Sequence, residues 1–355
     1  MNIRFYILYA LLFGFGVLGA RKAKIAFFIN LLSVRGTEVA VYDYADCNET
    51  VLGNESIIIN NTEYFDKPEY NHWLSDYTDS VREKFVNRFG SRIFNCANMQ
   101  EIERALQQEQ VDIFYALKYG VPDDKISKVC KNAVHAVFAV QKHGDAYATI
   151  SPWVSRVYGG NQVPFVPHMV RVDATTENLR QELGIPVDSV VFGRHGGVTT
   201  FNIPFAKEAV QEVALQHKDW YFVFLNTGKF CDMPNVIFLP ATGDMKYKTK
   251  FINSCDAMIH ARQDGETFGL ACAEFSIKNK PVITWLGSHD RCHVEILGSK
   301  GFYYNNKQEL LERLLYCGNN VQALRVGNWD CYSTDYSPEV VMKKFDEVFI
   351  QPLLY

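Results

Sequence analysis

Short apolar runs alternate with longer stretches of mixed polarity along most of the chain. Runs of this length between polar or turn-forming residues are typical of buried strands, and the longer stretches have the length of helices. In the first half the runs are Ile25–Asn30, Ile57–Ile59, Arg92–Phe94, Val111–Leu117, Val134–Val140 and Ala148–Ser151. Strands that alternate with helices predict a parallel sheet with helices on its faces. We therefore expect the first half to form one α/β domain.

A second series of apolar runs follows a segment that contains Pro164, Pro167 and Pro186. These runs are Val190–Gly193, Trp220–Leu225, Val236–Leu239, Ala257–His260, Val282–Thr284 and Phe302–Tyr304. The pattern predicts an α/β protein with two tandem, Rossmann-like, doubly wound domains. Such sheets bind ligands at the carboxyl ends of their strands, so a cleft between the domains is the expected site.

The pattern divides the chain into four parts. Residues 1–24 form a hydrophobic leader or membrane anchor, residues 25–170 the N-terminal domain, residues 171–336 the C-terminal domain, and residues 337–355 a C-terminal helix. Ser337-Pro338-Glu339 is typical of a helix start. The apolar stripe of this helix consists of Val341, Met342, Phe345, Val348 and Phe349.

Composition limits the classes of function. The 355 residues are 48% hydrophobic and 14% aromatic, which is enough for two cores. The net charge is −4, and no run of Lys or Arg follows the leader, so we expect no nucleic-acid partner. The nine cysteines are scattered and form no Cys-x-x-Cys pair, which predicts neither a zinc site nor a disulfide framework.

The N-terminus differs in composition from the rest of the chain. Residues 5–20 are uncharged and mostly apolar, and Arg21, Lys22 and Lys24 follow them. As a helix, this run would span about 24 Å, somewhat less than the hydrocarbon core of about 30 Å. The pattern predicts membrane association through residues 5–20, with the catalytic body held in the cytosol by the following cations.

The alternative localisation is the lumen of the secretory pathway. Three glycosylation sequons begin at Asn48, Asn54 and Asn60, where a lumenal chain would carry glycans.

The candidate chemistry is concentrated between Asp256 and Thr284. Two short apolar runs flank a loop and a helical stretch, which predicts the unit strand, loop, helix and strand with a parallel crossover. Gly265 and Gly269 flank the turn into the helix. Glycine permits close approach of the backbone, and a helix N-terminus presents unpaired N–H groups, so a phosphate is the expected ligand.

Two glutamates stand eight positions apart in this unit. Glu266 lies in the loop above the strand ends, and Glu274 lies further along the helix. A carboxylate at Glu274 can accept paired hydrogen bonds from vicinal hydroxyls, such as those of a ribose. The alternative is that Glu274 is a solvated helix residue and Glu266 a charge favoured by the helix dipole.

The segment resembles a known family signature. Glu266 and Glu274 are separated by seven residues, with Phe268-Gly269-Leu270 between them and Pro281-Val282-Ile283 after them. This spacing resembles glycosyltransferase family 4, whose members are retaining enzymes of the GT-B fold that use nucleotide sugars. Outside this segment the resemblance extends more loosely over about residues 25–350.

The resemblance implies a division of roles. The first domain would hold the acceptor, a glycan, lipid or protein, and the second the nucleotide-sugar donor, while the terminal helix would cross back onto the first domain. Glu266 would hold the sugar, Glu274 the ribose, and the amides of Phe268 and Gly269 the diphosphate. It implies no cofactor and no metal, because cations and amide dipoles neutralise the departing phosphate.

Arg194-His195-Gly196-Gly197 follows the first strand of the second domain. Arg194 is a candidate phosphate clamp, and Gly196 permits close backbone approach to a diphosphate. The alternative is an arginine paired with a surface carboxylate. The family places a lysine a few residues later, whereas this chain has none before Lys207, which makes Lys229 the substitute candidate.

Two candidates in the first domain come from the same resemblance. Gly36 stands where the family has a glycine loop near donor and acceptor, although only one glycine is present. His143 stands where the family often carries a histidine that contacts the transferred sugar. It is preferred to His135, which lies within an apolar run and is expected to be a satisfied core histidine.

The predicted function is therefore a glycosyltransferase with Glu266, His143 and Arg194 at the reaction centre. The alternatives are a nucleotide-sugar epimerase or hydrolase of the same fold, and a noncatalytic nucleotide-binding module.

Overall fold

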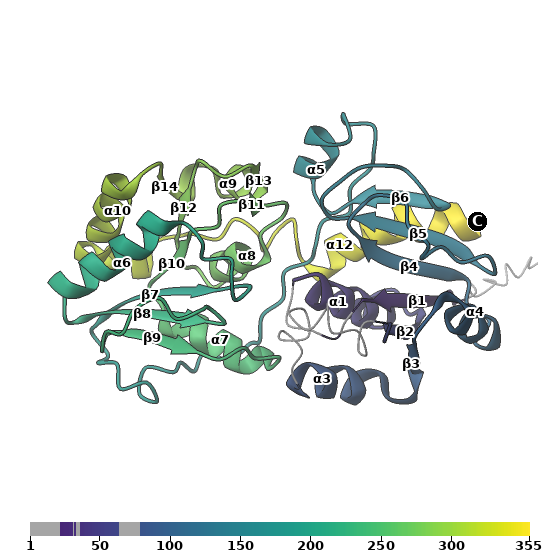
Figure 1. The fold of residues 1–355 in the computed structure, drawn as a ribbon, viewed down its shortest axis with the longest axis horizontal. Helices are drawn as coiled ribbons and strands as arrows, with labels where there is room; N and C mark the ends of the chain where they lie inside the picture. The colour runs from purple at the N-terminus through teal and green to yellow at the C-terminus, as the bar shows by residue number, and fades with distance from the viewer. Residues whose placement is uncertain (1–21, 31, 33–35, 64–78) are drawn as a thin grey trace, which may run out of the picture.

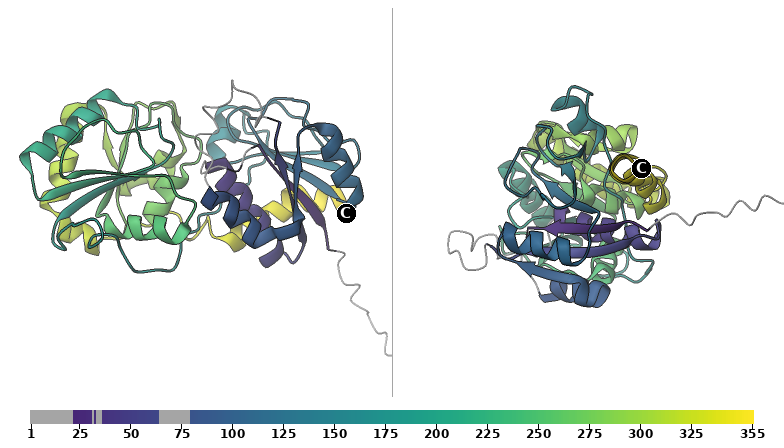
Figure 2. Two further views of the ribbon diagram at one scale, coloured as in Figure 1. Left: turned by 60° about the horizontal axis from the view of Figure 1, so that its bottom comes forward. Right: turned by 90° about the vertical axis from the view of Figure 1, so that its right-hand side faces the viewer.

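The computed structural model describes residues 22–30, 32, 36–63 and 79–355. These residues form two α/β domains, each built around a six-stranded parallel sheet (Figure 1). Figure 2 shows that helices cover both faces of each sheet. The predicted α/β class with two doubly wound domains is confirmed.

The first sheet has the strand order β3-β2-β1-β4-β5-β6, and all neighbouring strands are parallel. Its strands are β1 (Lys24–Ile29), β2 (Glu55–Asn61), β3 (Ile93–Cys96), β4 (Ile113–Lys118), β5 (Lys131–Ala136) and β6 (Ala146–Thr149). The helices of this domain are α1 (Gly36–Thr50), α3 (Asp79–Phe89), α4 (Met99–Gln108) and α5 (Pro152–Val157), with the 3₁₀ turn η2 (Gly90–Arg92).

The second sheet has the order β14-β12-β10-β7-β8-β9, which repeats the topology of the first sheet when it is read from β9. Its strands are β7 (Val190–His195), β8 (Trp220–Leu225), β9 (Val236–Leu239), β10 (Ala257–His260), β12 (Val282–Trp285) and β14 (Phe302–Tyr304). The helices are α6 (Pro204–Gln216), α7 (Met245–Ser254), α8 (Leu270–Ile277), α9 (Cys292–Leu297), α10 (Lys307–Asn319) and α11 (Val321–Val326), with the 3₁₀ turn η3 (Gly298–Lys300). Two short strands, β11 (Gly265–Glu266) and β13 (Asp290–Arg291), pair in parallel beside this sheet.

Each sheet reverses its strand order at one point. In the first sheet the reversal lies between β1 and β4, and in the second between β7 and β10. The carboxyl ends of strands at such a switch point leave a crevice, because the connections on its two sides run in opposite directions. The topology therefore provides one crevice in each domain.

The C-terminal segment returns to the first domain (Figure 1). It consists of α12 (Pro338–Phe345), the π-helical turn η4 (Asp346–Ile350) and α13 (Gln351–Leu354). Phe345 stacks with Tyr44 at a ring distance of 5.3 Å and with Phe27 at 6.3 Å. Most of the predicted apolar stripe is thus buried, since Val341, Met342, Phe345 and Phe349 are at most 1% exposed, while Val348 is half-buried.

The apolar runs predicted all the strands of the two large sheets, with one boundary error that matters. The run Val134–Val140 was expected to be strand throughout, but β5 ends at Ala136 and the chain leaves the sheet there. The two-residue strands β11 and β13 were missed because two residues carry no periodic signal.

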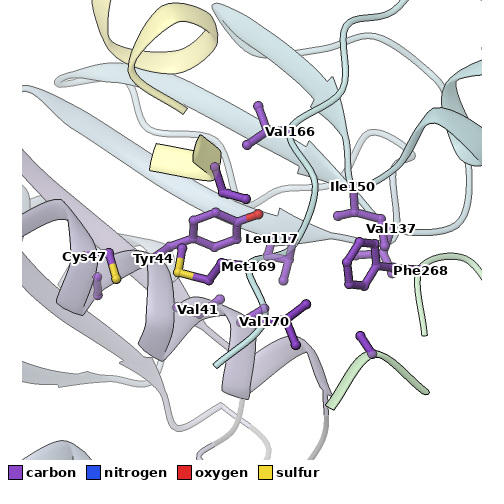
Figure 3. Close-up of a cluster of buried hydrophobic side chains, with 14 of the residues drawn as sticks. Val41, Tyr44, Cys47, Leu117, Val137, Ile150, Val166, Met169, Val170 and Phe268 are labelled. Atoms are coloured by element: carbon purple, nitrogen blue, oxygen red, sulfur yellow. The ribbon is translucent and has the colours of Figure 1, made fainter. Parts of the chain in front are cut away.

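A shared core joins the domains (Figure 3). Phe268 belongs to the second domain, and its ring lies among side chains of the first domain near Val137 and Ile150. It is 2% exposed and meets the ring of His168 edge-on at 5.4 Å. This packing fixes the relative position of the two domains next to the start of α8.

The predicted localisation needs correction. Within the described ranges 22–30, 32, 36–63 and 79–355, no helix has the length and apolarity to cross a membrane, which contradicts the expected membrane association. Residues 5–20, on which that prediction rested, lie outside the described residues. The sequons at Asn48 and Asn60 are buried in the folded domain, at 0% and 4% exposure, so neither side chain is accessible to a glycan.

His135 generates a prediction about acid stability. The Tyr115 hydroxyl donates to its Nδ1 at 2.7 Å, and its Nε2 donates to the Val166 carbonyl at 2.9 Å, which confirms a satisfied core histidine. Burial lowers the pKa of His135 to about 4, against the opposing effect of its carbonyl partners. Because the unfolded chain binds the proton at about pH 6.5, this group lowers the free energy of unfolding by about 2 kcal/mol between pH 7 and pH 5.

Urea unfolding of the wild type and His135→Gln at pH 7 and pH 5 measures this effect. The variant should lose about 2 kcal/mol of the pH-dependent drop, since glutamine does not titrate. An unchanged drop would show that His135 does not stay neutral in the folded protein.

Candidate functional site

A cleft opens between the two domains at the carboxyl ends of both sheets. It contains about 830 Å³ of empty space, including the part that is open to solvent, a size typical of ligand sites. One wall comes from α1 and α3 of the first domain, with Gly36, Glu38, Tyr42 and Lys84 among its residues. The other wall comes from α7, α8 and the loops after β7 and β8, with Gly196, Lys248, Leu270 and Glu274 among its residues.

Helices α1 and α8 begin at this cleft from opposite sides. A Cβ placed on Gly36, the first residue of α1, would lie 3.6 Å from Leu270 Cδ1 in the first turn of α8. Gly269 forms the N-cap of α8 with a φ of 94° and supplies no side-chain cap. The first amides of α8 therefore lack a capping side chain and can bind an anion in the cleft.

Glu274 is buried against the cleft wall and is paired on both oxygens. Its Oε1 accepts from Lys248 Nζ at 2.5 Å, and its Oε2 lies 2.9 Å from His195 Nε2. That second contact does not have hydrogen-bond geometry, and neither of its atoms has another partner among the described residues. Burial alone would raise the pKa of Glu274, but the charges of Lys248 and His195 outweigh it and lower the pKa to about 2.

Among the described residues that line the cleft there are two lysines, which no sequence motif predicted. Lys248 lies on α7 of the second domain and Lys84 on α3 of the first, so they face the cleft from opposite sides. Lys84 Nζ lies 3.8 Å from the centre of the Tyr42 ring, and no carboxylate of the described residues forms an ion pair with it. Burial lowers its pKa to about 8, against the opposing charge of Asp43. No local motif marks either lysine, because both come from ordinary amphipathic helices.

His260 and Arg262 hold the Glu266 carboxylate at the switch point of the second sheet. His260, the last residue of β10, contacts Glu266 Oε1 through Nε2 at 3.1 Å, and Arg262 donates to Oε2 at 3.1 Å. Burial would raise the pKa of Glu266, but Arg262, His260 and His293 together lower it to about 2. The side chain remains 19% exposed, so an ionised, oriented carboxylate is available at this position.

The backbone around Glu266 depends on two glycines. At Gly265 φ is 77°, and a Cβ there would lie 1.9 Å from the carbonyl oxygen of Asp290, on the neighbouring strand β13. At Gly269 a Cβ would lie 3.0 Å from the Cβ of His293. These glycines were predicted from an anion site, but in the structure they also allow β11, β13 and α9 to pack closely.

Arg194 is not placed as a phosphate clamp. Its side chain is buried at the end of β7 and does not line the cleft. Its guanidinium donates to the carbonyl oxygens of Asn226 and Gly197 at 3.2 Å and 3.0 Å, and also to the hydroxyls of Thr227 and Thr200. All these acceptors are uncharged, so the alternative, pairing with a surface carboxylate, is also absent from the described residues. The arginine instead shapes the loop that presents Gly196 to the cleft.

Two predicted residues lie away from the cleft. His143 precedes β6, and its neighbours Gly144 and Asp145 lie against Val134 and Asn132 in the first half of β5. Because β5 ends at Ala136 and does not continue to Val140, the chain turns back before His143, which therefore does not follow the carboxyl end of the strand.

Lys229 is 61% exposed and pairs with Asp232 at 2.8 Å, so it does not supply the missing lysine. Phe268 also contacts no cleft space, because it is packed between the domains.

A second cavity lies at the switch point of the first sheet, between β1 and β4. It holds about 530 Å³ of empty space, and Asn30, Glu38 and Lys118 are among its lining residues. Tyr119 and Phe138 stand at its rim, 63% and 37% exposed, with ring centres 5.4 Å apart. Glu38 lines both this cavity and the interdomain cleft, so the two spaces adjoin.

No protein-family model matches the chain, and no curated protein matches it in sequence. Solved structures do match. A glycosyltransferase from Rickettsia africae has a TM-score of 0.66 at 14% identity, over 94% of this chain and 99% of that one. HepE from Anabaena, in complex with UDP and glucose, has a TM-score of 0.68 at 12% identity, over 93% and 100%.

A protein assigned as a UDP-N-acetylglucosamine 2-epimerase, from Listeria monocytogenes, has a TM-score of 0.56 at 10% identity, over 93% and 97%. Likeness at this level of identity shows the fold. The chain has the GT-B fold, as the signature around Glu266 and Glu274 implied.

The close approach of the Asp290 backbone to Gly265 predicts that one added methyl group strongly lowers the free energy of unfolding. Gly265→Ala must move β13 or distort β11, and we expect it to lower the free energy of unfolding by more than about 2 kcal/mol. Gly184→Ala is the matched control, because its φ is also positive, at 66°, but its Cβ would meet no atom within 4 Å. It should cost about 1 kcal/mol or less. Equal costs in urea unfolding would contradict the proposed packing constraint.

Proposed function

We propose that this protein is a glycosyltransferase that transfers a sugar from a nucleotide-sugar donor to an acceptor. One observation carries the proposal. The interdomain cleft combines the open N-terminus of α8 with Lys84, Lys248 and the ionised carboxylate of Glu274, and Glu266, which does not line this cleft, supplies a second ionised carboxylate just before α8. A diphosphate requires helix N-terminal amides and cations. The hydroxyls of the sugar and of the ribose require carboxylates as hydrogen-bond acceptors.

The donor would lie with its diphosphate between α8 and the two lysines. Negative charge grows on the departing diphosphate as the glycosidic bond breaks, so cations and amide dipoles at this place lower the barrier. Glu274 would bind the ribose once Lys248 turns from its carboxylate toward the phosphate. After this exchange Lys248 would face the charge of the phosphate, and Glu274 would accept hydrogen bonds from the ribose hydroxyls while it stays beside His195.

The transferred sugar would lie beside Glu266. The carboxylate is ionised and accepts hydrogen bonds, so it suits a role in holding sugar hydroxyls rather than donating a proton. Arg194 would contribute indirectly by shaping the loop at Gly196. Retention of anomeric configuration is part of the proposal and rests on the resemblance in this segment.

The second cavity is the proposed acceptor position. It adjoins the donor cleft at Glu38 and carries the exposed rings of Tyr119 and Phe138 at its rim. Aromatic faces of this kind bind the apolar face of a sugar ring, and the nearby Asn30 and Lys118 offer polar groups for its hydroxyls. We therefore favour a glycan acceptor.

An epimerase or hydrolase that acts on nucleotide sugars is the second candidate, because a protein assigned as an epimerase shares the fold. The test is incubation with a panel of nucleotide sugars, with and without glycan acceptors, followed by product analysis. A glycosylated acceptor supports the transferase. An isomerised nucleotide sugar or free sugar without transfer would favour the second candidate, and binding without turnover a noncatalytic module.

Lys84 gives a sharp test of the donor site. We expect Lys84→Gln to weaken the affinity for uridine diphosphate by about 10-fold or more, because a charged donor to the phosphate is lost. Among the described residues no carboxylate forms an ion pair with Lys84, so folding should be retained. Lys229→Gln is the matched control, since Lys229 is exposed and outside the cleft. Calorimetric titration that shows equal affinities in both variants would remove Lys84 from the site.

The proposed neutralisation by lysines and amide dipoles predicts that turnover does not require a divalent cation. Transfer measured in excess EDTA should equal the untreated rate. Complete loss of activity that Mg²⁺ or Mn²⁺ restores would contradict this part of the proposal.

A further inference from the structure

A chain of buried polar side chains lies behind Glu266. His260 Nε2 contacts Glu266 Oε1 at 3.1 Å, and His260 Nδ1 contacts Thr284 Oγ1 at 2.9 Å. Thr284 Oγ1 in turn contacts His293 Nε2 at 2.9 Å. The exposures of His260, Thr284 and His293 are 5%, 0% and 0%, so water does not compete for these contacts.

With both histidine rings neutral, the donors and acceptors of this chain fit one arrangement of protons. Ionised Glu266 only accepts, so His260 must donate from Nε2, and a neutral His260 then accepts at Nδ1. The Thr284 hydroxyl donates to that atom and accepts from His293 Nε2. His293 Nδ1 is left as a bare acceptor, and it is indeed buried with no partner among the residues that the structure describes. Burial lowers the pKa of His293 to about 3, which agrees with a neutral ring.

The backbone fixes the same four residues relative to one another. His260 and Thr284 are directly paired residues at the carboxyl ends of the parallel strands β10 and β12. Glu266 pairs with Arg291 across β11 and β13, and His293 follows two residues after Arg291. The histidine rings lie 4.7 Å apart. The contact chain therefore links rigid elements, which is the arrangement that holds a functional group in place.

We propose that Thr284 and His293 are positioning residues, which act through His260 to hold the Glu266 carboxylate in one orientation toward the transferred sugar. The inference rests on the proposed function, because the sugar is its assumed ligand. Two buried histidines and a threonine are more than a carboxylate needs for charge compensation, since Arg262 already supplies a cation. These residues orient the Glu266 carboxylate, because His260 can keep one tautomer only while Thr284 donates to it.

The test is the substitution Thr284→Val, which keeps the shape of the side chain and removes both of its hydrogen bonds. Thr284→Ser restores the hydroxyl. Thr149→Val is the matched control, because Thr149 is also a fully buried strand threonine but lies in the first domain, with its hydroxyl bonded to the Ser151 carbonyl. If the valine variant does not fold, His293→Leu interrupts the same chain one step further from Glu266.

Two readouts are needed. The first is the ¹⁵N spectrum of labelled histidines, in which the His260 tautomer should be single in the wild type and in Thr284→Ser, and mixed in Thr284→Val. The second is donor turnover, in which kcat should fall by about 10- to 100-fold in Thr284→Val with KM for the donor little changed. Thr149→Val should match the wild type in both.

The outcomes test separately whether the hydrogen-bond chain exists and whether it positions Glu266. An unchanged His260 signal in Thr284→Val would overturn the hydrogen-bond chain. A changed signal with unchanged kcat would overturn the positioning role. If the wild type turns over no nucleotide sugar, the proposed function fails and the positioning role fails with it, whereas the spectrum still decides whether the chain of contacts exists.

Discussion

The burial of Phe268 between the domains is the interaction on which the site depends. Phe268 stands between Glu266 and the N-cap Gly269, so anchoring its ring in the first domain places the start of α8 at the cleft. Truncation of a buried phenylalanine typically costs about 3–5 kcal/mol, much of the net stability of a domain. The residue that looked like a ligand contact is therefore the anchor of the contacts beside it.

A second, polar anchor lies close to the first. Asp290, on β13, accepts hydrogen bonds from Trp153 Nε1 at 3.0 Å and from the Tyr158 hydroxyl at 2.8 Å, both in the first domain. Because β13 pairs with β11, this contact between the domains reaches the backbone of Glu266. The relative position of the domains and the position of the Glu266 carboxylate therefore depend on the same pair of strands.

The two buried carboxylates in and beside the cleft each have basic partners. Glu266 lies against Arg262 and His260, and Glu274 against Lys248 and His195. A buried carboxylate without such partners would lose its charge, whereas here both stay ionised. Lys84 differs, since among the described residues it lies over the ring of Tyr42 and forms no ion pair, although the charge of Asp43 acts on it. Under the proposed function, Lys84 is therefore the cation that the diphosphate of the donor would meet.

The sequence by itself determined the fold class and the unit that holds Glu266 and Glu274. Strands buried on both faces are continuous apolar runs, and a helix start after a glycine is a local signal, so both can be recognised from neighbouring residues. Only the tertiary structure decided which side chains reach the cleft. It brought Lys84 and Lys248 together from helices far apart in the chain, turned Arg194 toward its own loop, and left His143 near the opposite edge of the sheet. The reason is physical: local periodicity fixes which face of an element is buried, but not which distant element covers it.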